Sequence, residues 1–163
     1  MLGMEIGASF NPLASKRAGW NVKVVDHAPR DVLREKYKGR TDIDTDQIEE
    51  VDIVWRTKTL HECFDVADHH NFDYCLASHL IEHIPDLLSF FHSLEKLLRP
   101  NGILSLAVPD KRFEFDAFKP VVNNGMFKGL KPGATKPIAL TVDRTRYEPK
   151  AKGQKGWMIV SLD

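Results

Sequence analysis

The clearest hydrophobic pattern in the chain covers residues 72–110 and predicts a strand, a helix and a second strand. A short apolar run at 74–77 is followed by apolar residues that recur every three or four positions over 87–98, the spacing of one helical face. Residues 99–102 include a basic residue, a proline and a glycine, which together favour the end of a helix. The near-continuous apolar run at 103–108 is typical of a strand buried on both faces of a parallel sheet. The segment therefore predicts a β-α-β unit.

The same alternation of apolar runs and helical patterns extends over the N-terminal part of the chain. Further strands are expected at residues 2–6, 22–25 and 51–55, and helical segments at 12–18, 30–37 and 60–66. Together these elements predict an α/β fold with a Rossmann-like, open and mostly parallel sheet between flanking helices. Two late apolar runs could add antiparallel edge strands, at residues 138–142 and 157–162.

Composition changes near residue 119. Residues 119–156 carry nine Lys or Arg against two acidic residues, together with four of the nine prolines and five of the ten glycines. We therefore expect an α/β domain over residues 1–118 and a basic, Gly/Pro-rich extension over 119–163. The extension could bind an acidic partner such as RNA. It has few aromatic residues to stack on bases, so a solvated extension is the preferred interpretation and nucleic acid is not an expected partner.

The chain as a whole has 163 residues, a net charge of zero and a hydrophobic content of 42%, which is ordinary for a globular protein. No apolar run approaches the roughly 18 residues needed to cross a membrane, and no leader pattern precedes the first strand. These observations predict a cytoplasmic protein without a membrane partner. Cys63 and Cys75 lie in apolar surroundings, so two buried thiols are expected rather than a disulfide or a metal pair.

Two residues at predicted strand ends form a candidate nucleotide site. Gly7 follows the first strand, where the missing Cβ lets a ligand approach the backbone. Asp26 lies 19 residues further on at the end of the second strand, about the spacing at which an acid reaches a ribose hydroxyl in nucleotide-binding folds. The alternative is an ordinary strand-to-helix turn, which a single glycine equally allows.

Three short strings in the chain occur in the order and spacing of a known family: FDYC at 72–75, EHIPD at 82–86 and LRPNG at 98–102. With these strings the chain resembles the second half of a class I S-adenosylmethionine-dependent methyltransferase domain. The string AVPDKRFEFD at 107–116 is in addition similar to a subset of bacterial methyltransferases of the type 11/12 kind, associated with glycan loci. The resemblance implies a Rossmann-like fold and S-adenosylmethionine as the cofactor.

The resemblance also implies a set of cofactor-binding residues: Glu5, Gly7, Ala8, Asp26, His27 and Ser78. Glu5 and Gly7 match the family pattern E-x-G-x-G-x-G, although Ser9 and Asn11 stand where further glycines are usual. Gly7 and Ala8 would approach the methionine part of the cofactor. Asp26 would bind the ribose hydroxyls, and His27 would lie near the adenine.

The family often has an acid after the third strand, which meets the adenine amine. Residues 54–57 contain no acid here, and Asp65 or Asp68 would have to substitute for it.

The loop after the fourth predicted strand carries the candidate catalytic residue. Ser78 and His79 would line the methyl-transfer site, with His79 a base toward an acceptor hydroxyl or, alternatively, a loop-capping residue. Glu82 and His83 are expected to shape the following turn. His79, Glu82 and His83 also resemble the E-x-x-E-H metal site of some magnesium-dependent O-methyltransferases. An imidazole suits zinc or iron better than magnesium and no fourth ligand is evident, so no metal is predicted.

The predicted function is methyl transfer to a small-molecule or glycan acceptor. The alternative is a catalytically silent binding module or partner subunit of the same fold. Two observations support this alternative: the first strand begins near residue 2, and the sequence after 116 does not match the family's final strands, so that we expect a domain shortened at both ends. A second copy could cover the open cleft, which would make the protein a homo-oligomer. A nicotinamide-dependent dehydrogenase has the same fold class, but its glycine fingerprint is missing.

Overall fold

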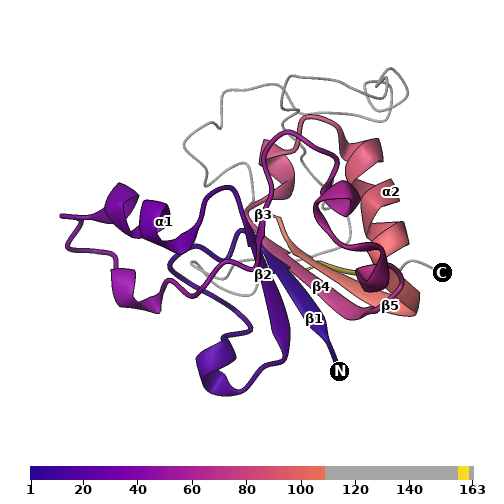
Figure 1. The fold of residues 1–163 in the computed structure, drawn as a ribbon, viewed down its shortest axis with the longest axis horizontal. Coiled ribbons are helices and arrows are strands. Elements are labelled where there is room, and N and C mark those ends of the chain that lie inside the picture. The colour runs from indigo at the N-terminus through magenta and orange to yellow at the C-terminus, as the bar shows by residue number, and fades with distance from the viewer. Residues whose placement is uncertain (109–157, 162–163) are drawn as a thin grey trace, which may run out of the picture.

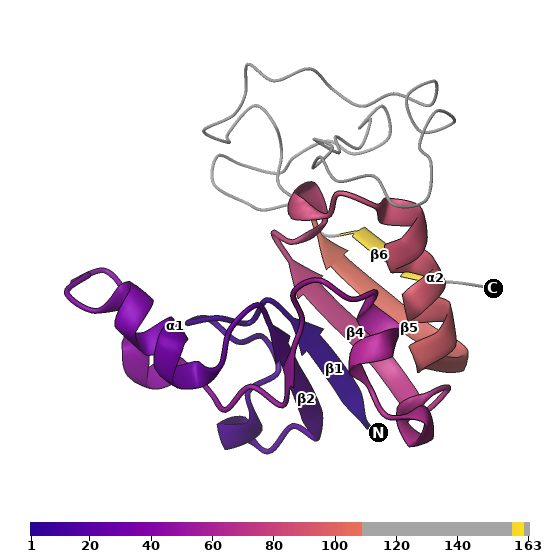
Figure 2. The ribbon, with the colours of Figure 1, turned by 45° about the horizontal axis from the view of Figure 1, so that its top comes forward.

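The strands form a single sheet. The structure, a computed structural model, describes residues 1–108 and the strand at 158–161. The sheet has the order β3-β2-β1-β4-β5-β6. Figure 1 labels β1 to β5, and Figure 2 labels β6 at the edge beside β5. The strands are β1 (Gly3–Ile6), β2 (Val22–Asp26), β3 (Ile53–Val54), β4 (Phe72–Ser78), β5 (Leu98–Ala107) and β6 (Met158–Ser161). The pairs formed among β1–β5 are parallel, and β6 is antiparallel to β5. This is the Rossmann-like α/β sheet that the sequence predicted.

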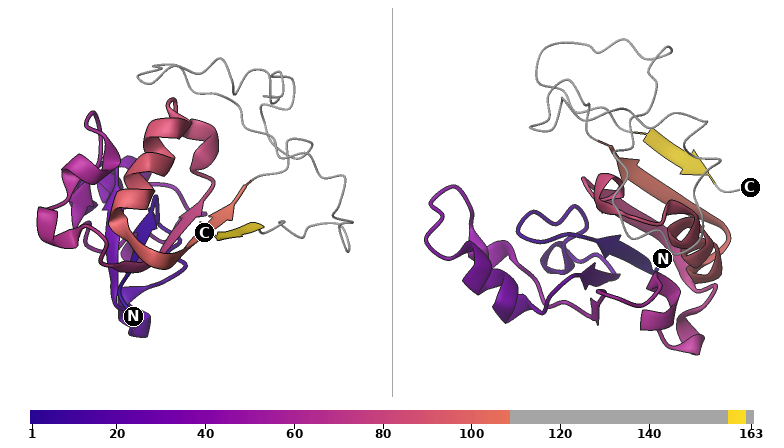
Figure 3. Two further views of the ribbon diagram at one scale, coloured as in Figure 1. Left: turned by 90° about the vertical axis from the view of Figure 1, so that its right-hand side faces the viewer. Right: turned by 90° about the horizontal axis from the view of Figure 1, so that it is seen from above.

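The two α-helices in the described part of the chain lie at opposite ends of the sheet. Helix α2 (Leu87–Leu97) covers β4 and β5, whereas α1 (Arg30–Tyr37) lies beyond β2, as Figures 2 and 3 show. Short 3-10 turns complete the connections: η1 (Lys16–Ala18), η2 (Thr45–Gln47), η3 (Leu60–Cys63), η4 (Val66–Asp68) and η5 (Ile81–His83). Helix α2 begins after Pro85, and the Asp86 carboxylate accepts a hydrogen bond from the Ser89 N–H at 3.0 Å, which caps the helix. None of the described helices is long and apolar enough to cross a membrane.

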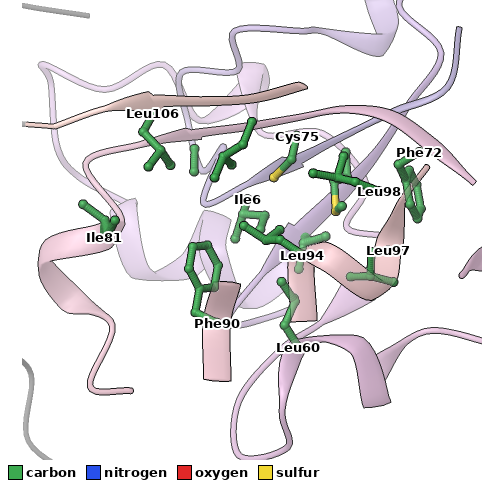
Figure 4. Close-up of a cluster of buried hydrophobic side chains, with 14 of the residues drawn as sticks. Ile6, Leu60, Phe72, Cys75, Ile81, Phe90, Leu94, Leu97, Leu98 and Leu106 are labelled. Carbon is green, nitrogen blue, oxygen red and sulfur yellow. The ribbon is translucent and has the colours of Figure 1, made fainter. Parts of the chain in front are cut away.

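The main hydrophobic core lies between the sheet, α2 and η3 (Figure 4). Alternate residues of the central strands are buried in it, such as Ile6 of β1, Cys75 of β4 and Leu106 of β5. Helix α2 contributes the side chains that recur at helical spacing, and Leu60 of η3 closes the end of the cluster. Because this core fixes β1 and β4 against α2, it also fixes the loops that leave the carboxyl ends of these strands.

Two predicted elements are shorter in the structure than the sequence predicted. Only the 3-10 turn η1 forms within 12–18, and the backbone N–H groups of Leu13 and Ala14 donate to the Glu5 carboxylate. The third strand covers Ile53–Val54 rather than 51–55, although the N–H groups of Asp52 and Trp55 still donate to the carbonyls of Val24 and Asp26 in β2, at 2.9 and 2.8 Å.

The predicted helix stop at residues 99–102 is present as an irregular turn inside β5. The pairing with β4 shifts between Phe72 and Tyr74, and Asn101 adopts a left-handed φ of 64°. A Cβ at Gly102 would lie 2.9 Å from the Arg99 carbonyl oxygen, so the turn needs the glycine.

Predictions for the rest of the chain fall partly outside the described residues. The late run at 157–162 supplies β6, antiparallel at the edge of the sheet as expected. The run at 138–142 and the proposed boundary at residue 118 lie outside the described residues. Both cysteines are free, but only Cys75 is buried, and burial raises the pKa of its thiol; Cys63 is partly exposed.

Candidate cofactor site

A cavity of about 590 Å³ opens at the carboxyl edge of the sheet, where open α/β sheets bind ligands. Its walls come from the ends of β1 and β2, from the segment after β3, and from the loop and first turns of α2. The residues that line it are 6–7, 26–27, 55–60, 80, 83–86 and 89–90. Three of the predicted cofactor-binding residues, Gly7, Asp26 and His27, are therefore brought together in one cavity.

Gly7 forms the turn between β1 and the loop that follows. Its N–H donates to the Val25 carbonyl at 2.8 Å, which continues the pairing with β2 by one residue. Its φ is +75°, in the left-handed region that L-residues with a side chain rarely adopt. A Cβ at this position would meet only the Leu80 side chain, at 3.7 Å, so the backbone conformation is what calls for glycine here.

Asp26 ends β2 and lines the cavity, although only 4% of its side chain is exposed. The oxygen Oδ2 accepts the N–H of Ser9 at 3.1 Å. The oxygen Oδ1 accepts the N–H of His27 at 2.7 Å and lies 2.6 Å from the Nδ1 of the same residue. These donors fix the orientation of the carboxylate. A carboxylate has about four lone-pair sites, so it retains capacity for hydroxyl donors from a ligand.

Glu5 does not line the cavity but supports the loop that follows Gly7. The residue is 2% exposed, and its carboxylate accepts the N–H groups of Leu13 at 2.7 Å and Ala14 at 2.8 Å. Burial raises the pKa of the Glu5 carboxyl, although these two hydrogen bonds act in the opposite direction. Its position in the structure is that of a loop support. Ala8 is buried in the same loop and is not among the cavity residues.

Ser78 and His79 lie at the end of β4, outside the cavity wall. The backbone of His79 has a φ of +50°, and its N–H donates to the Ala107 carbonyl at 2.9 Å, so the two residues lie beside the end of β5. The His79 Nδ1 is 3.7 Å from Glu82 Oε1. The structure thus places the predicted catalytic residue at the same sheet edge as the cavity but not in its lining.

The Glu82 carboxylate lies between two imidazoles. His83, which lines the cavity, has its Nε2 3.9 Å from the same oxygen that faces His79. Within residues 1–108, no group of three or more His, Cys, Asp or Glu side chains is arranged to hold a metal ion.

The segment after β3 lies beside Asp26, whose carbonyl accepts the Trp55 N–H at 2.8 Å, and it lines the cavity with residues to which the sequence assigned no role. Trp55 stacks on Phe90 of α2 with ring centroids 6.0 Å apart and planes 15° apart, and its indole N–H donates to the Lys58 carbonyl at 2.9 Å. Arg56 Nε donates to the His27 carbonyl at 2.9 Å. The sequence could have indicated Trp55 and Arg56 as cavity residues only from their position directly after the third strand. The stacking of Trp55 on Phe90 could not be predicted, because it joins two segments far apart in the sequence.

The two acids considered as substitutes for the missing acid after β3 do not line the cavity. Asp68 pairs instead with Lys23 Nζ at 2.6 Å, in the first half of β2. In the described part of the chain, the segment after β3 lines the cavity with residues 55–60, none of which is acidic.

A family model described as "Methyltransferase domain" matches residues 3–141, well over half of the chain. No curated protein matches the chain.

Solved structures with a similar fold include S-adenosylmethionine-dependent methyltransferases from Archaeoglobus fulgidus and Aquifex aeolicus. The match to the first has 13% sequence identity and a TM-score of 0.47, and it covers 78% of this chain and 57% of that protein. The match to the second has 14% sequence identity and a TM-score of 0.46, and it covers 71% of this chain and 60% of that protein. The chain thus spans less than two thirds of either protein, and at these TM-scores the family assignment rests on the family model.

Proposed function

The chain belongs to the methyltransferase domain family, and on this premise we propose that its cavity binds S-adenosylmethionine for methyl transfer to a small-molecule or glycan acceptor. The cofactor of this family is S-adenosylmethionine, whose sulfonium supplies an electrophilic methyl group. The observation that carries the proposal is the buried Asp26, whose carboxylate is held by fixed donors at the end of β2 and which lines a cavity of about 590 Å³.

The residues around the cavity fit the chemical parts of the cofactor. Asp26 offers carboxylate oxygens to the two ribose hydroxyls, which are hydrogen-bond donors. Gly7 leaves its backbone open toward the aminoacyl part, with Ala8 next to it in the loop that Glu5 holds. Trp55 and Phe90 provide apolar and aromatic surface of the kind that receives a planar base.

The contribution of the protein to the reaction would be positioning. Methyl transfer needs the acceptor atom in line with the sulfonium–methyl bond, and holding two reactants at near-attack distance lowers the barrier substantially. Ser78 and His79, beside the end of β5, are proposed to face the acceptor, with His79 taking the proton of an acceptor hydroxyl.

Calorimetric titration with S-adenosylhomocysteine, the demethylated product, tests the cofactor site. We expect saturable binding by the wild-type chain and a loss of about tenfold or more in Asp26→Ala, because a ribose hydroxyl loses a charged acceptor. Asp31→Ala is the matched control, since Asp31 is an exposed residue on α1 outside the cavity. Absence of binding by the wild-type chain would reject the proposal.

The acceptor and the turnover need a second experiment. The chain is incubated with S-adenosylmethionine carrying a labelled methyl group and with a panel of oligosaccharides and nucleotide sugars, and label transfer is measured in wild type and His79→Ala. Transfer that depends on His79 supports the enzyme. Binding of S-adenosylhomocysteine without transfer to any of these acceptors favours the silent binding module instead. Chromatography with light scattering tests the homo-oligomer, and the cytoplasmic location stays a prediction.

A further inference from the structure

We propose that Lys36 and His27 form a relay that positions the carboxylate of Asp26 for the ribose, so that the last turn of helix α1 is part of the cofactor site. The inference rests on the proposed function for the ribose itself, but the relay is a property of the free protein. In the relay, the ammonium group of Lys36 contacts the imidazole of His27, and this imidazole contacts the carboxylate of Asp26.

The imidazole of His27 lies between two charged groups. Its Nδ1 is 2.6 Å from Asp26 Oδ1, and its Nε2 is 3.4 Å from the Lys36 Nζ. The side chain is 56% exposed, whereas that of Asp26 is 4% exposed. His27 therefore lies at the outer end of the cavity with the carboxylate beneath it, and it contacts the same oxygen that its own N–H holds at 2.7 Å.

The neighbours of His27 determine its tautomer. A lysine ammonium group can only donate hydrogen bonds, so Nε2 of His27 must be the acceptor when it bonds to Lys36. The proton of a neutral imidazole is then on Nδ1, from which it is donated to Asp26. In the other tautomer the lone pair of Nδ1 would face the carboxylate, and the imidazole would no longer donate to Asp26. The Asp26 carboxylate, which can only accept, favours the same tautomer as Lys36, and Lys36 thus reinforces the hydrogen bond that His27 donates to Asp26.

A second connection from α1 reaches the other carboxylate oxygen. The Tyr37 hydroxyl lies 3.2 Å from Ser9 Oγ, and the Ser9 N–H donates to Asp26 Oδ2 at 3.1 Å. Tyr37 also packs edge-on against Phe10, with ring centroids 5.1 Å apart. Consecutive residues of α1 therefore act on the two oxygens of one carboxylate, which makes the end of this helix a positioning element for the ribose.

The tautomer of His27 can be measured without any ligand, by NMR of the chain labelled with ¹⁵N in its histidine rings. In wild type we expect the His27 signal of the Nδ1–H tautomer, and in Lys36→Met a partial shift toward the Nε2–H tautomer, because Asp26 alone then favours Nδ1–H. Lys38→Met is the control, because Lys38 is an exposed lysine at the same end of α1, and its Nζ pairs with Glu35 at 3.1 Å instead of with His27. An unchanged His27 tautomer in Lys36→Met overturns the relay.

The effect on the ribose is measured by calorimetry with S-adenosylhomocysteine and with its analogue lacking both ribose hydroxyls. We expect S-adenosylhomocysteine to bind about two- to fivefold more weakly to Lys36→Met and about tenfold more weakly to His27→Phe. His27→Asn, whose amide N–H can replace Nδ1–H, should recover part of the loss. The analogue should bind wild type and variants equally, since it has no hydroxyl for Asp26 to accept.

Three outcomes separate this inference from the proposed function. Equal losses for S-adenosylhomocysteine and the analogue would show a general disturbance of the cavity and overturn the positioning role. Unchanged binding in both His27 variants would overturn it as well. If wild type binds neither compound, the proposed function fails and the ribose role with it, while the NMR result still decides the relay between Lys36, His27 and Asp26.

Discussion

Gly7 occupies a backbone conformation that is costly for any other residue, and it does so next to the cavity. Gly19 has a comparable φ of +88° with no atom within 4 Å of an added Cβ, and it lies outside the cavity lining. We expect Gly7→Ala and Gly19→Ala to lose a similar amount of stability, about 1–2 kcal/mol, because the left-handed conformation is penalised equally in both. Urea denaturation measures this loss.

The two glycine variants should differ in ligand binding. The methyl group added in Gly7→Ala would enter the space at the end of β1, so this variant should bind S-adenosylhomocysteine about tenfold or more weakly, while Gly19→Ala binds as wild type. Equal binding by the two variants would mean that the ligand does not approach the backbone at Gly7.

At the scale of single residues, the sequence indicated candidate residues at strand ends, and the fold brings Gly7 and Asp26 into the lining of one cavity. Gly7 and Asp26 could be found because a strand end and a residue type are both local features. The contacts of His27 could not be found in this way, because its imidazole meets Lys36 from another element. The stacking of Trp55 on Phe90 joins two segments that only the folded core brings together.

At the scale of elements, the contact between η3 and α2 contains a histidine, His61, whose pKa is lowered by its surroundings. His61 Nε2 lies 3.0 Å from Lys96 Nζ, and His61 Nδ1 lies 3.0 Å from the buried hydroxyl of Ser93. Since Lys96 can only donate, His61 accepts from it and donates to Ser93, whose hydroxyl donates to the Ser89 carbonyl at 2.8 Å. Burial, followed by the charge of Lys96, lowers the pKa of His61 below its usual value; His69 and His92 act in the same direction and Glu62 opposes them.

This lowered pKa predicts a pH-dependent contribution to stability. The unfolded chain takes up a proton near pH 6.5 and the folded chain only at lower pH, so the contribution is present above pH 6.5 and is lost as the pH falls below it. We expect the difference in urea midpoint between wild type and His61→Asn to shrink from pH 7.5 to 5.5. In Lys96→Met the pKa of His61 should rise, which weakens the pH dependence. A difference that stays constant with pH would contradict this explanation.

The bounds of an element could be predicted where they depend on residues adjacent in the sequence. Helix α1 covers the predicted residues 30–37, and α2 begins where Pro85 and Asp86 indicated. Of the helix expected at 12–18 only the 3-10 turn Lys16–Ala18 forms, and Gly19 ends it with a left-handed φ of 88°. The N–H groups of Leu13 and Ala14 donate to Glu5 of β1, a contact between separate segments that helical spacing alone does not show.

At the scale of the whole molecule, the alternation of elements predicted the fold class but not the neighbours of each strand. Strand β1 lies between β2 and β4, and β5 pairs with a strand more than fifty residues later. The β5–β6 pairing aligns Ile103 with Ser161 and Leu106 with Met158. Such pairings are selected by the assembly of the sheet, since each apolar run could in principle pair with several others.

Removing β6 should therefore destabilise the domain through the edge of β5. Deletion of residues 158–163 leaves the N–H and C=O groups of β5 unpaired along Ile103–Leu106, and Ile103 is already 49% exposed. We expect a loss of about 2 kcal/mol or more in the free energy of unfolding, since several backbone hydrogen bonds are lost at about 1 kcal/mol each. Deletion of residues 162–163 alone is the control, because the pairing ends at Ser161. An open edge is also a template for another chain, so the longer deletion should elute as larger species in size-exclusion chromatography at increasing protein concentration. If both deletions unfold at the same urea concentration and remain the same size, β6 contributes neither stability nor protection to the sheet.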